Sequence, residues 1–400
     1  MVLLLALFNL SYRIGRESVG QWDESLYATS AWEMNKGPYS VATTRDGQLD
    51  YYNSKPPLNA WLIATSFRAL GTNLVALRVP SVVAAWLTVV LLQWWVGRMF
   101  GTVQAVLASL VLATGFAFIH EHAGRSGNAD APFTLLVTVV VALAWLSQRH
   151  PWAVAWLGPT LGAIFLLKGP AVLLPLLCLV GFKVLCRHRV RWAAGPVCVA
   201  VVAFGLSVGG WAYARYALDG RQFFAAMLEN DLWGVTATHL EGHVQGPLFY
   251  LNVLQRYHYE WLVPIAIAAV VCRRAWPIVG RHILASIRDR EPVTVLMICW
   301  FVATFVLPSV MQTRITWYLN SFYPLGAILC GLLFEHAGRS VGRARLAEAF
   351  VLTVCLAVVV AESKSLWRLH RVTNLDTSVQ GVLREHARRT GHIRVFRDKH

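Results

Sequence analysis

The sequence predicts an all-α polytopic membrane protein, and three observations support this fold class. Of 400 residues, 56% are hydrophobic and 14% are charged, whereas a typical soluble domain carries about 25% charged residues. The mean hydropathy is +0.50. The apolar residues gather in repeated runs of roughly 17 to 22, the length that a helix needs to cross a bilayer. One bundle of spanning helices is therefore expected in place of several soluble domains.

The apolar runs predict about eleven spanning helices. In chain order they cover residues 1–12, 75–97, 103–120, 131–147, 152–168, 170–186, 193–213, 260–272, 292–309, 315–334 and 346–362. The first run is about half a span long, and it is a poor signal peptide because no basic residue precedes it. We expect this first helix to be clipped or to penetrate the membrane only partly.

The arginines predict how the bundle is oriented. The formal charge is +15, and with the N-terminus inside, thirteen arginines fall in short cytoplasmic loops, whereas the short external loops hold little more than Arg125, Lys168 and Arg314, as the positive-inside rule predicts. The thirteen are Arg98, Arg149, Arg187, Arg189, Arg191, Arg273, Arg274, Arg281, Arg288, Arg290, Arg339, Arg343 and Arg345. The pattern indicates orientation signals and argues against a nucleic-acid-binding surface. The seven cysteines contain no CxxC pair, so they predict neither a metal site nor a disulfide framework.

Two external segments, about 13–74 and 214–258, are long enough to be functional loops. We divide the chain into a transmembrane domain of residues 1–362, with these segments as its catalytic loops, and a short polar tail of residues 363–400. The tail is expected to be external. The protein is thus predicted to be a multi-pass protein of the inner (plasma) membrane, with its active site facing the periplasm or exterior.

The first external loop is expected to contain two interfacial helices. Between Glu24 and Met34, apolar and aromatic residues recur at the spacing of a short helix lying along the membrane surface. A second helix is expected to open at Pro56 and Pro57 and to run to Leu70, because proline is favoured in the first turn of a helix.

The ionisable residues outside the cytoplasmic loops gather at the external face. They come from five loops and are Asp23, Glu24, Lys55, His120, Glu121, His122, Arg125, Asp130, Lys168, His239, Glu241, His243 and Arg314. No predicted span carries an acidic or basic residue near its midplane, where ion-coupled transporters place such groups. A cluster at the membrane surface suits a reaction between a lipid-borne anionic substrate and a second substrate that arrives at the interface.

The residue types in this cluster fit phosphate binding and proton transfer. Lys55, Lys168 and Arg314 can hold a phosphate, the lysines as point charges and the arginine as a fork. Asp23 can accept the proton of an attacking hydroxyl, since general bases are often Asp or Glu.

Each residue also has a structural interpretation. Asp23 and Asp130 precede helical segments and can act as N-caps, and Lys55 can snorkel from a helix end. His239 and His243 are four residues apart and can share a helix face as ligands of a divalent metal ion. No third ligand is evident in the sequence, so no definite cofactor is predicted.

Four motifs in matching order carry a family resemblance. The segments WDESLYATSAWEMNKG, YYNSKPPLNAWL, RSGNADAPFTLL and LLKGPAVLLPL, within residues 20–330, resemble the GT-C class of integral-membrane glycosyltransferases. The likeness is to the protein O-mannosyltransferases and to the bacterial transferases that place 4-amino-4-deoxyarabinose on lipid A. This sequence departs from the larger members in its short first span, its fewer expected spans and the reduction of the soluble C-terminal domain to a tail.

The resemblance implies a GT-C fold and a set of site residues. It implies Asp23, Glu24 and Asp130 as catalytic residues, with Asp23 at the acceptor hydroxyl. It implies Lys55, Lys168 and Arg314 as ligands of the donor phosphate, with Arg314 standing where the family often has a lysine. His239 and His243 correspond loosely to a later loop that binds substrate or metal.

The function implied is transfer of a sugar from a polyprenyl-phosphate donor to a hydroxyl acceptor, in a single displacement with inversion. The acceptor is lipid A, another glycolipid, a glycan or a protein, and the remaining partners are membrane lipids, with no nucleic acid. Two other functions stay open, a flippase or transporter of lipid-linked sugars and a ligase of surface polysaccharide. A non-catalytic scaffold would leave five converging polar loops unexplained.

Overall fold

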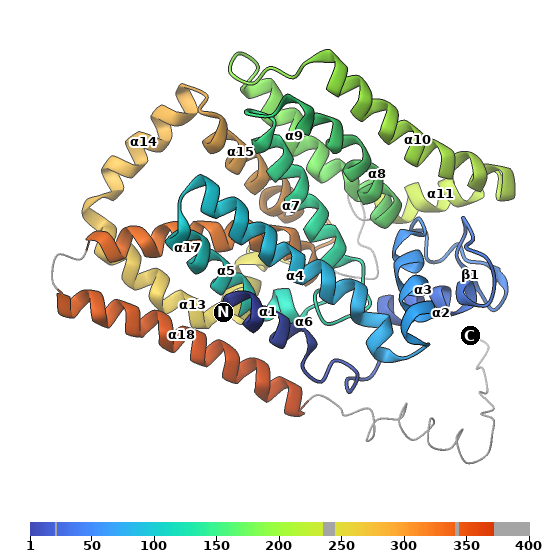
Figure 1. The fold of residues 1–400 in the computed structure, drawn as a ribbon, viewed down its shortest axis with the longest axis horizontal. Helices are drawn as coiled ribbons and strands as arrows, with labels where there is room; N and C mark the ends of the chain where they lie inside the picture. The colour runs from blue at the N-terminus through green and yellow to red at the C-terminus, as the bar shows by residue number, and fades with distance from the viewer. Residues whose placement is uncertain (21, 235–244, 341–343, 372–400) are drawn as a thin grey trace.

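The computed structural model describes residues 1–20, 22–234, 245–340 and 344–371 and is built almost wholly of helices (Figure 1). The α-helices are α1 Val2–Ser11, α2 Asp23–Asn35, α3 Leu58–Leu70, α4 Leu74–Met99, α5 Thr102–Ala113, α6 Phe116–His120, α7 Asp130–Leu146, α8 Leu157–Lys168, α9 Leu173–Leu185, α10 Ala194–Asp219, α11 Gln222–Leu228, α13 Phe249–Val271, α14 Trp276–Arg288, α15 Pro292–Phe301, α16 Leu307–Val310, α17 Tyr323–Ser340 and α18 Ala344–Arg371. The short segments are the 3-10 helices η1 Pro151–Trp156, η2 Gly169–Val172, η5 Cys272–Arg274 and η7 Thr316–Phe322, the π-helical turns η3 Glu229–Trp233 and η6 Val302–Val306, and the antiparallel strands β1 Thr44–Arg45 and β2 Gln48–Leu49.

Six helical segments among the described residues are long and apolar enough to cross a membrane. They are Leu74–Met99, Pro151–Leu185, Ala194–Asp219, Pro292–Val310, Thr316–Ser340 and Glu348–Arg371. The bent pair α13 and α14 makes seven if it is one span, and α1, α5 and α7 are shorter apolar helices. Each apolar run expected from the sequence lies on described helix, so the helical multi-pass class is confirmed. The number of eleven spans stays a prediction.

The two runs 152–168 and 170–186 are continuous in the structure. They are joined by the 3-10 turn η2, which begins at Gly169. Gly169 has a φ of 53°, a left-handed conformation that glycine adopts without the steric cost of a Cβ. This turn places Lys168 at the end of α8, beside the start of α7.

Both helices expected within residues 13–74 are present, as α2 and α3, while their position at a membrane interface stays a prediction. Pro57 stands at the N-cap of α3. The helices α2 and α3 pack against each other, and Tyr27, Ala31 and Ile63 belong to the main core. In Figure 1 these helices and the small β-hairpin form one group at the right of the molecule.

Close helix contacts require small residues at particular positions. A Cβ on Gly331 of α17 would lie 2.8 Å from the backbone oxygen of Gln104 in α5, and one on Gly158 of α8 would lie 1.9 Å from the oxygen of Ala200 in α10. Helices in membranes approach closely where small residues face each other. These contacts hold α17 on α5 and the outer helix α10 on α8.

One expectation about charge inside the bundle is wrong. Glu260 stands halfway along α13, and its side chain is fully buried and accepts a hydrogen bond of 3.1 Å from Lys364 Nζ of α18. The pair is permitted there because each buried charge has an opposite partner. The last helix α18 also continues to Arg371, nine residues past the boundary expected at residue 362, and residues 372–400 lie outside the described part of the chain.

Candidate active site

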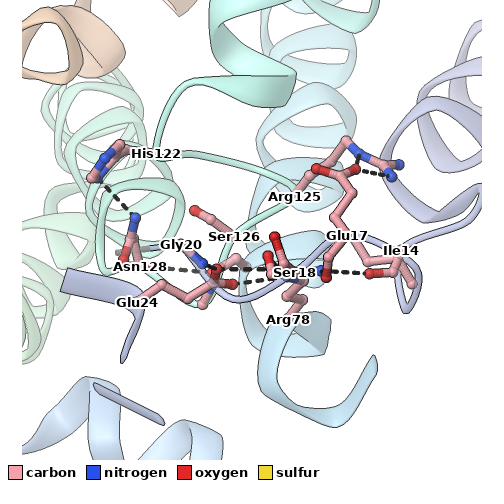
Figure 2. Close-up of polar contacts among 12 residues, drawn as sticks. Ile14, Glu17, Ser18, Gly20, Glu24, Arg78, His122, Arg125, Ser126 and Asn128 are labelled. Atoms are coloured by element: carbon pink, nitrogen blue, oxygen red, sulfur yellow. Dashed lines mark hydrogen bonds and ion pairs between the residues drawn. The ribbon is translucent and has the colours of Figure 1, made fainter. Parts of the chain in front are cut away.

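Glu24 lies in a buried clamp formed with Arg78 of α4 (Figure 2). The Arg78 guanidinium donates to both Glu24 oxygens at 2.8 and 3.1 Å. The same carboxylate accepts from the backbone N–H groups of Gly20 at 2.6 Å and Gly127 at 2.8 Å. Burial alone would raise the pKa of Glu24, but the hydrogen bond and charge of Arg78 and the two backbone N–H groups together lower it. Glu24 is therefore a charged group that ties three segments together.

Arg78 and Arg125 fix the chain that leads into α2. Arg78 donates to the backbone oxygens of Ile14, Glu17 and Ser18 at 2.8 to 2.9 Å. Arg125 forms an ion pair of 2.7 Å with the Glu17 carboxylate, and Figure 2 shows the two arginines on either side of this segment. Both guanidinium groups are almost completely buried, so the position of the segment before Asp23 is set by charge-assisted hydrogen bonds.

Asp23 is the first residue of α2 and remains accessible, with its side chain 35% exposed. The N-cap is Trp22, and it makes no side-chain cap, so the capping interpretation of Asp23 is wrong. The Asp23 carboxylate faces His122, with 4.0 Å between Oδ2 and Nδ1. His122 in turn stacks on Trp317 at 3.7 Å between ring centres and is hydrogen bonded to Asn128 at 2.8 Å.

Lys55 pairs with an acidic residue from a distant part of the chain. Its amine lies 3.6 Å from Asp231 of η3, with the two side chains 25% and 17% exposed. Ser54 donates a hydrogen bond of 2.8 Å to the other Asp231 oxygen. Burial by itself would lower the pKa of Lys55, but the carboxylates of Asp231 and Asp23 with the hydroxyl of Tyr27 raise it above the usual value for lysine. Lys55 is thus a fixed cation, and the snorkelling interpretation does not describe its contacts.

Asp130 and Lys168 meet at the junction of α7 and α8. Lys168 Nζ donates to Asp130 Oδ1 at 2.6 Å, with the side chains 14% and 5% exposed. Asp130 is the first residue of α7, and the N-cap, Ala129, makes no side-chain hydrogen bond. The expected capping role is therefore wrong, because the carboxylate is directed to the lysine.

Tyr27 lies close enough to several of these charged groups to interact with them electrostatically. It is buried in α2, and burial raises the pKa of Tyr27; the charge of Lys55 opposes that rise, while Asp23, Asp130 and Asp231 add to it. The hydroxyl of Tyr27 therefore lies within electrostatic reach of all four charged side chains. Residues that are up to about two hundred positions apart in sequence, such as Asp23 and Asp231, therefore come together around Tyr27.

Arg314 lies at the edge of this cluster. Its guanidinium donates to the backbone oxygens of Ser309, at 2.9 Å, and Gln245. Tyr250 interacts electrostatically with both Arg314 and Tyr318, and Tyr318 in turn with Lys55. His239 and His243 lie outside the described residues. Within the residues that the structure describes, no group of three or more His, Cys, Asp or Glu side chains is placed to hold a metal ion.

Two residues of the cluster were not expected from the sequence. Arg78 stands near the start of a predicted span, and a charge at that position is a signal of a buried partner. Asp231 lies in the second long loop among ordinary polar residues, and only the folded chain brings it to Lys55. The sequence places His122 in the external cluster but contains no signal for its stacking on Trp317.

The class of protein follows from these features and from comparison with known proteins. Residues 54–210 match the family model described as dolichyl-phosphate-mannose-protein mannosyltransferase. The fold is shared with ArnT from Cupriavidus metallidurans, in a crystal structure bound to undecaprenyl phosphate, with a TM-score of 0.68 at 18% identity over 97% of this chain and 71% of that one. The archaeal oligosaccharyltransferase AglB from Archaeoglobus fulgidus, in complex with an inhibitory peptide and a dolichol-phosphate, gives a TM-score of 0.53 at 10% identity over 91% and 55% of the chains. The chain has the GT-C fold, and the resemblance to this class is confirmed.

Two curated relatives are similar to most of the chain. The chain is 28% identical over 355 residues to the undecaprenyl phosphate-alpha-4-amino-4-deoxy-L-arabinose arabinosyl transferase of Pseudomonas savastanoi pv. phaseolicola, covering 86% of this chain and 62% of that protein. It is 30% identical over 367 residues to the Pseudomonas aeruginosa protein of the same name, covering 88% and 61%. The chain is thus a relative of the GT-C glycosyltransferases of the protein mannosyltransferase and ArnT type. It spans about three fifths of the length of these curated relatives.

Proposed function

We propose that this protein transfers a sugar from a polyprenyl-phosphate donor to a hydroxyl acceptor at the periplasmic or external face of the inner membrane. The observation that carries the proposal is the convergence of Asp23, Lys55, Asp130, Lys168 and Asp231 at one end of a membrane bundle. This cluster offers an accessible carboxylate beside fixed cations, in a chain related to glycosyltransferases. In this proposal residues 1–362 form the catalytic domain and the remaining residues are an appendage to it.

The reaction needs a base at the acceptor and a cation at the leaving group. Asp23 takes the proton of the acceptor hydroxyl, whose oxygen forms a bond to the anomeric carbon as the bond from that carbon to the phosphate oxygen breaks. The electron pair of the broken bond stays on the polyprenyl phosphate, so the configuration inverts in one displacement. Lys55 stabilises the phosphate charge as it develops, and a preorganised cation of this kind is often a large catalytic contribution.

The other site residues have supporting roles in this mechanism. Glu24 positions Asp23, because its own oxygens are taken by Arg78, Gly20 and Gly127. Lys168 is held by Asp130 and offers a second cation for the donor phosphate. Arg314 is the third expected phosphate ligand, and His239 and His243 remain candidates for binding substrate or a divalent metal ion.

The names of the relatives favour one donor and leave the acceptor open. The Pseudomonas proteins carry undecaprenyl phosphate and 4-amino-4-deoxy-L-arabinose in their names, which supports a modified pentose on that lipid as the first donor to test. Lipid A, another glycolipid, a glycan and a protein are all candidate acceptors. A flippase for lipid-linked sugars and a polysaccharide ligase are the competing functions.

The test is sugar transfer in reconstituted vesicles. Radiolabelled undecaprenyl-phosphate sugars are supplied with membrane extract as the acceptor, and wild type is compared with Asp23→Asn and Lys55→Ala. Loss of a general base lowers turnover by about a hundredfold to ten-thousandfold. The matched controls are Asp46→Asn and Lys36→Ala, which remove the same charges at exposed positions in the same loop.

The outcomes separate the competing functions. Label that moves from lipid to an acceptor, and that is lost in both site variants but kept in both controls, supports the transferase. Label that crosses the bilayer without changing chemical form supports the flippase instead. Full transfer by Asp23→Asn would refute the mechanism, whatever the identity of the acceptor.

A further inference from the structure

The proposed reaction assigns no role to the helix α14. It has thirteen residues and is bent by 87° from α13 at η5. At 1.5 Å per residue it is about 20 Å long, too short to cross a hydrocarbon core of about 30 Å. Ser286 is the one buried residue that the structure records in it. The helix therefore lies against the bundle along a narrow strip and leaves its other faces open.

The open faces of α14 carry an apolar stripe and a pair of arginines. Trp276, Ile283 and Ile287 lie within one narrow sector at 100° per residue and are 43%, 44% and 42% exposed. Arg281 and Arg288 are also exposed and lie together, about 120° to 140° from Trp276 on the same wheel. Leu284, at about 80°, extends the apolar stripe toward the arginines, and Ile278, at about 200°, lies beyond them; they are 67% and 62% exposed. An apolar stripe with arginines along one edge is the pattern of a helix that lies in the plane of a membrane surface.

A neighbouring loop extends the positive charge beside α14. Cys186 at the end of α9 is hydrogen bonded through its sulfur to the backbone oxygen of Arg290 at 3.6 Å. This contact joins the turn after α14 to the α9–α10 connection, where Arg187, Arg189 and Arg191 are all exposed. In Figure 1 the end of α14 and the α9–α10 connection both lie at the top of the molecule. We call these exposed arginines, 187, 189, 191, 281, 288 and 290, the basic platform.

The basic platform and the candidate active site lie toward opposite ends of α13. Tyr250, in the first turn of α13, donates a hydrogen bond to the backbone oxygen of Ile315, next to Arg314. The helix α13 covers 23 residues and ends at Val271, with a kink at His258, so its contour is on the order of 30 Å. The platform and the sugar-transfer site are therefore at opposite ends of α13, so the charge of the platform has a role separate from binding the donor phosphate.

We propose that α14 and the basic platform form an in-plane binding surface for anionic phospholipid headgroups. Charge complementarity selects this occupant. Asp289 is the one exposed carboxylate between Arg273 and Arg290, and Glu291 is used to cap α15. Clusters of four to eight basic residues beside a membrane attract anionic lipid with about 1 kcal/mol for each residue. The apolar stripe holds the helix at the depth where headgroups meet the arginines.

The test counts retained lipids on the purified full chain. The protein is purified with equal amounts of phosphatidylglycerol and phosphatidylcholine, and the lipids that remain bound are counted by native mass spectrometry. Wild type is expected to prefer phosphatidylglycerol, and Arg281→Gln/Arg288→Gln is expected to reduce that preference about fivefold to thirtyfold. Raising the salt should have the same effect on wild type, because exposed charges are screened.

Two controls keep the result interpretable. Arg281→Lys/Arg288→Lys keeps the charge and should keep the preference. Arg221→Gln/Arg256→Gln removes two exposed arginines outside the platform and should also leave it unchanged. Equal retention of both lipids by wild type, or an unchanged preference in the first double variant, would overturn the proposal. A change of oligomeric mass in that variant would also overturn it, by identifying a second copy of the chain as the occupant of α14. No transfer activity is measured, so this test is independent of the proposed function.

Discussion

Replacement of Arg78 by leucine tests the clamp that holds the start of α2. The guanidinium is 2% exposed and makes five hydrogen bonds, two to Glu24 and three to backbone oxygens of residues 14–18. Removing it leaves a carboxylate that is 3% exposed with only backbone N–H donors. Breaking a buried ion pair costs about 3–5 kcal/mol, so Arg78→Leu should lose about that much stability.

The pH dependence of this loss follows from the pKa of Glu24. In wild type the pKa of Glu24 in the folded state is lowered, so the clamp contributes stability above the unfolded-state pKa of about 4.3 and loses it as the pH falls through the folded-state value. In Arg78→Leu, burial dominates and raises the pKa of Glu24, so protonation relieves the folded state. The defect of the variant should therefore be smaller at pH 5 than at pH 8.

Thermal unfolding in detergent measures both effects. Cys178, Cys186, Cys272 and Cys299 are buried free thiols, whereas Cys198 and Cys355 are exposed. With these two replaced by serine in every variant, a thiol-reactive fluorescent dye reports unfolding. Arg78→Leu should unfold at a temperature lower by roughly 5 °C or more, and Glu24→Gln in the same chain should recover part of that loss because it removes the unpaired charge. An unchanged unfolding temperature, or a defect that grows as the pH falls from 8 to 5, would refute this account of the clamp.

Three further predictions concern the bundle and the site. Gly158→Ala places a Cβ against the backbone of Ala200 and should lower the unfolding temperature by several degrees through strain of about 1–3 kcal/mol. The control Gly205→Ala, whose Cβ meets no atom within 4 Å, should leave the unfolding temperature unchanged. Equal unfolding temperatures for the two variants would contradict the packing of α8 on α10. Lys168→Met leaves the Asp130 carboxylate unpaired and should reduce both stability and sugar transfer. Adding Asp130→Asn to this variant should restore stability but not transfer. Recovery of transfer in the double variant would show that Asp130 and Lys168 are not needed for the reaction. Asp231→Asn removes the largest of the charges that raise the pKa of Lys55. The KM for the donor should therefore begin to rise at a lower alkaline pH than in wild type, because Lys55 loses its proton sooner. An unchanged dependence of KM on pH would count against Lys55 as the phosphate ligand.

The class of the protein and several of its elements were determined by the sequence alone. Twenty-residue apolar runs have few stable forms in lipid other than helices, so the helical bundle followed from composition. The helices α2 and α3 followed from the spacing around Tyr27 and from the prolines before Leu58. The motifs around Asp23, Lys55 and Lys168 indicated the GT-C class, because their order along the chain is more specific than any one of them.

Only the tertiary structure decided which charges are partners. The pairs Glu24–Arg78, Lys55–Asp231 and Glu260–Lys364 join residues separated by 54 to 176 positions, and no local pattern encodes such a distance. For this reason Asp130, which reads as a helix cap in sequence, is in the structure the counter-ion of Lys168. Hydrophobic periodicity acts over a few turns and is legible in the chain itself, whereas electrostatic pairing depends on which helices lie side by side once the bundle has packed.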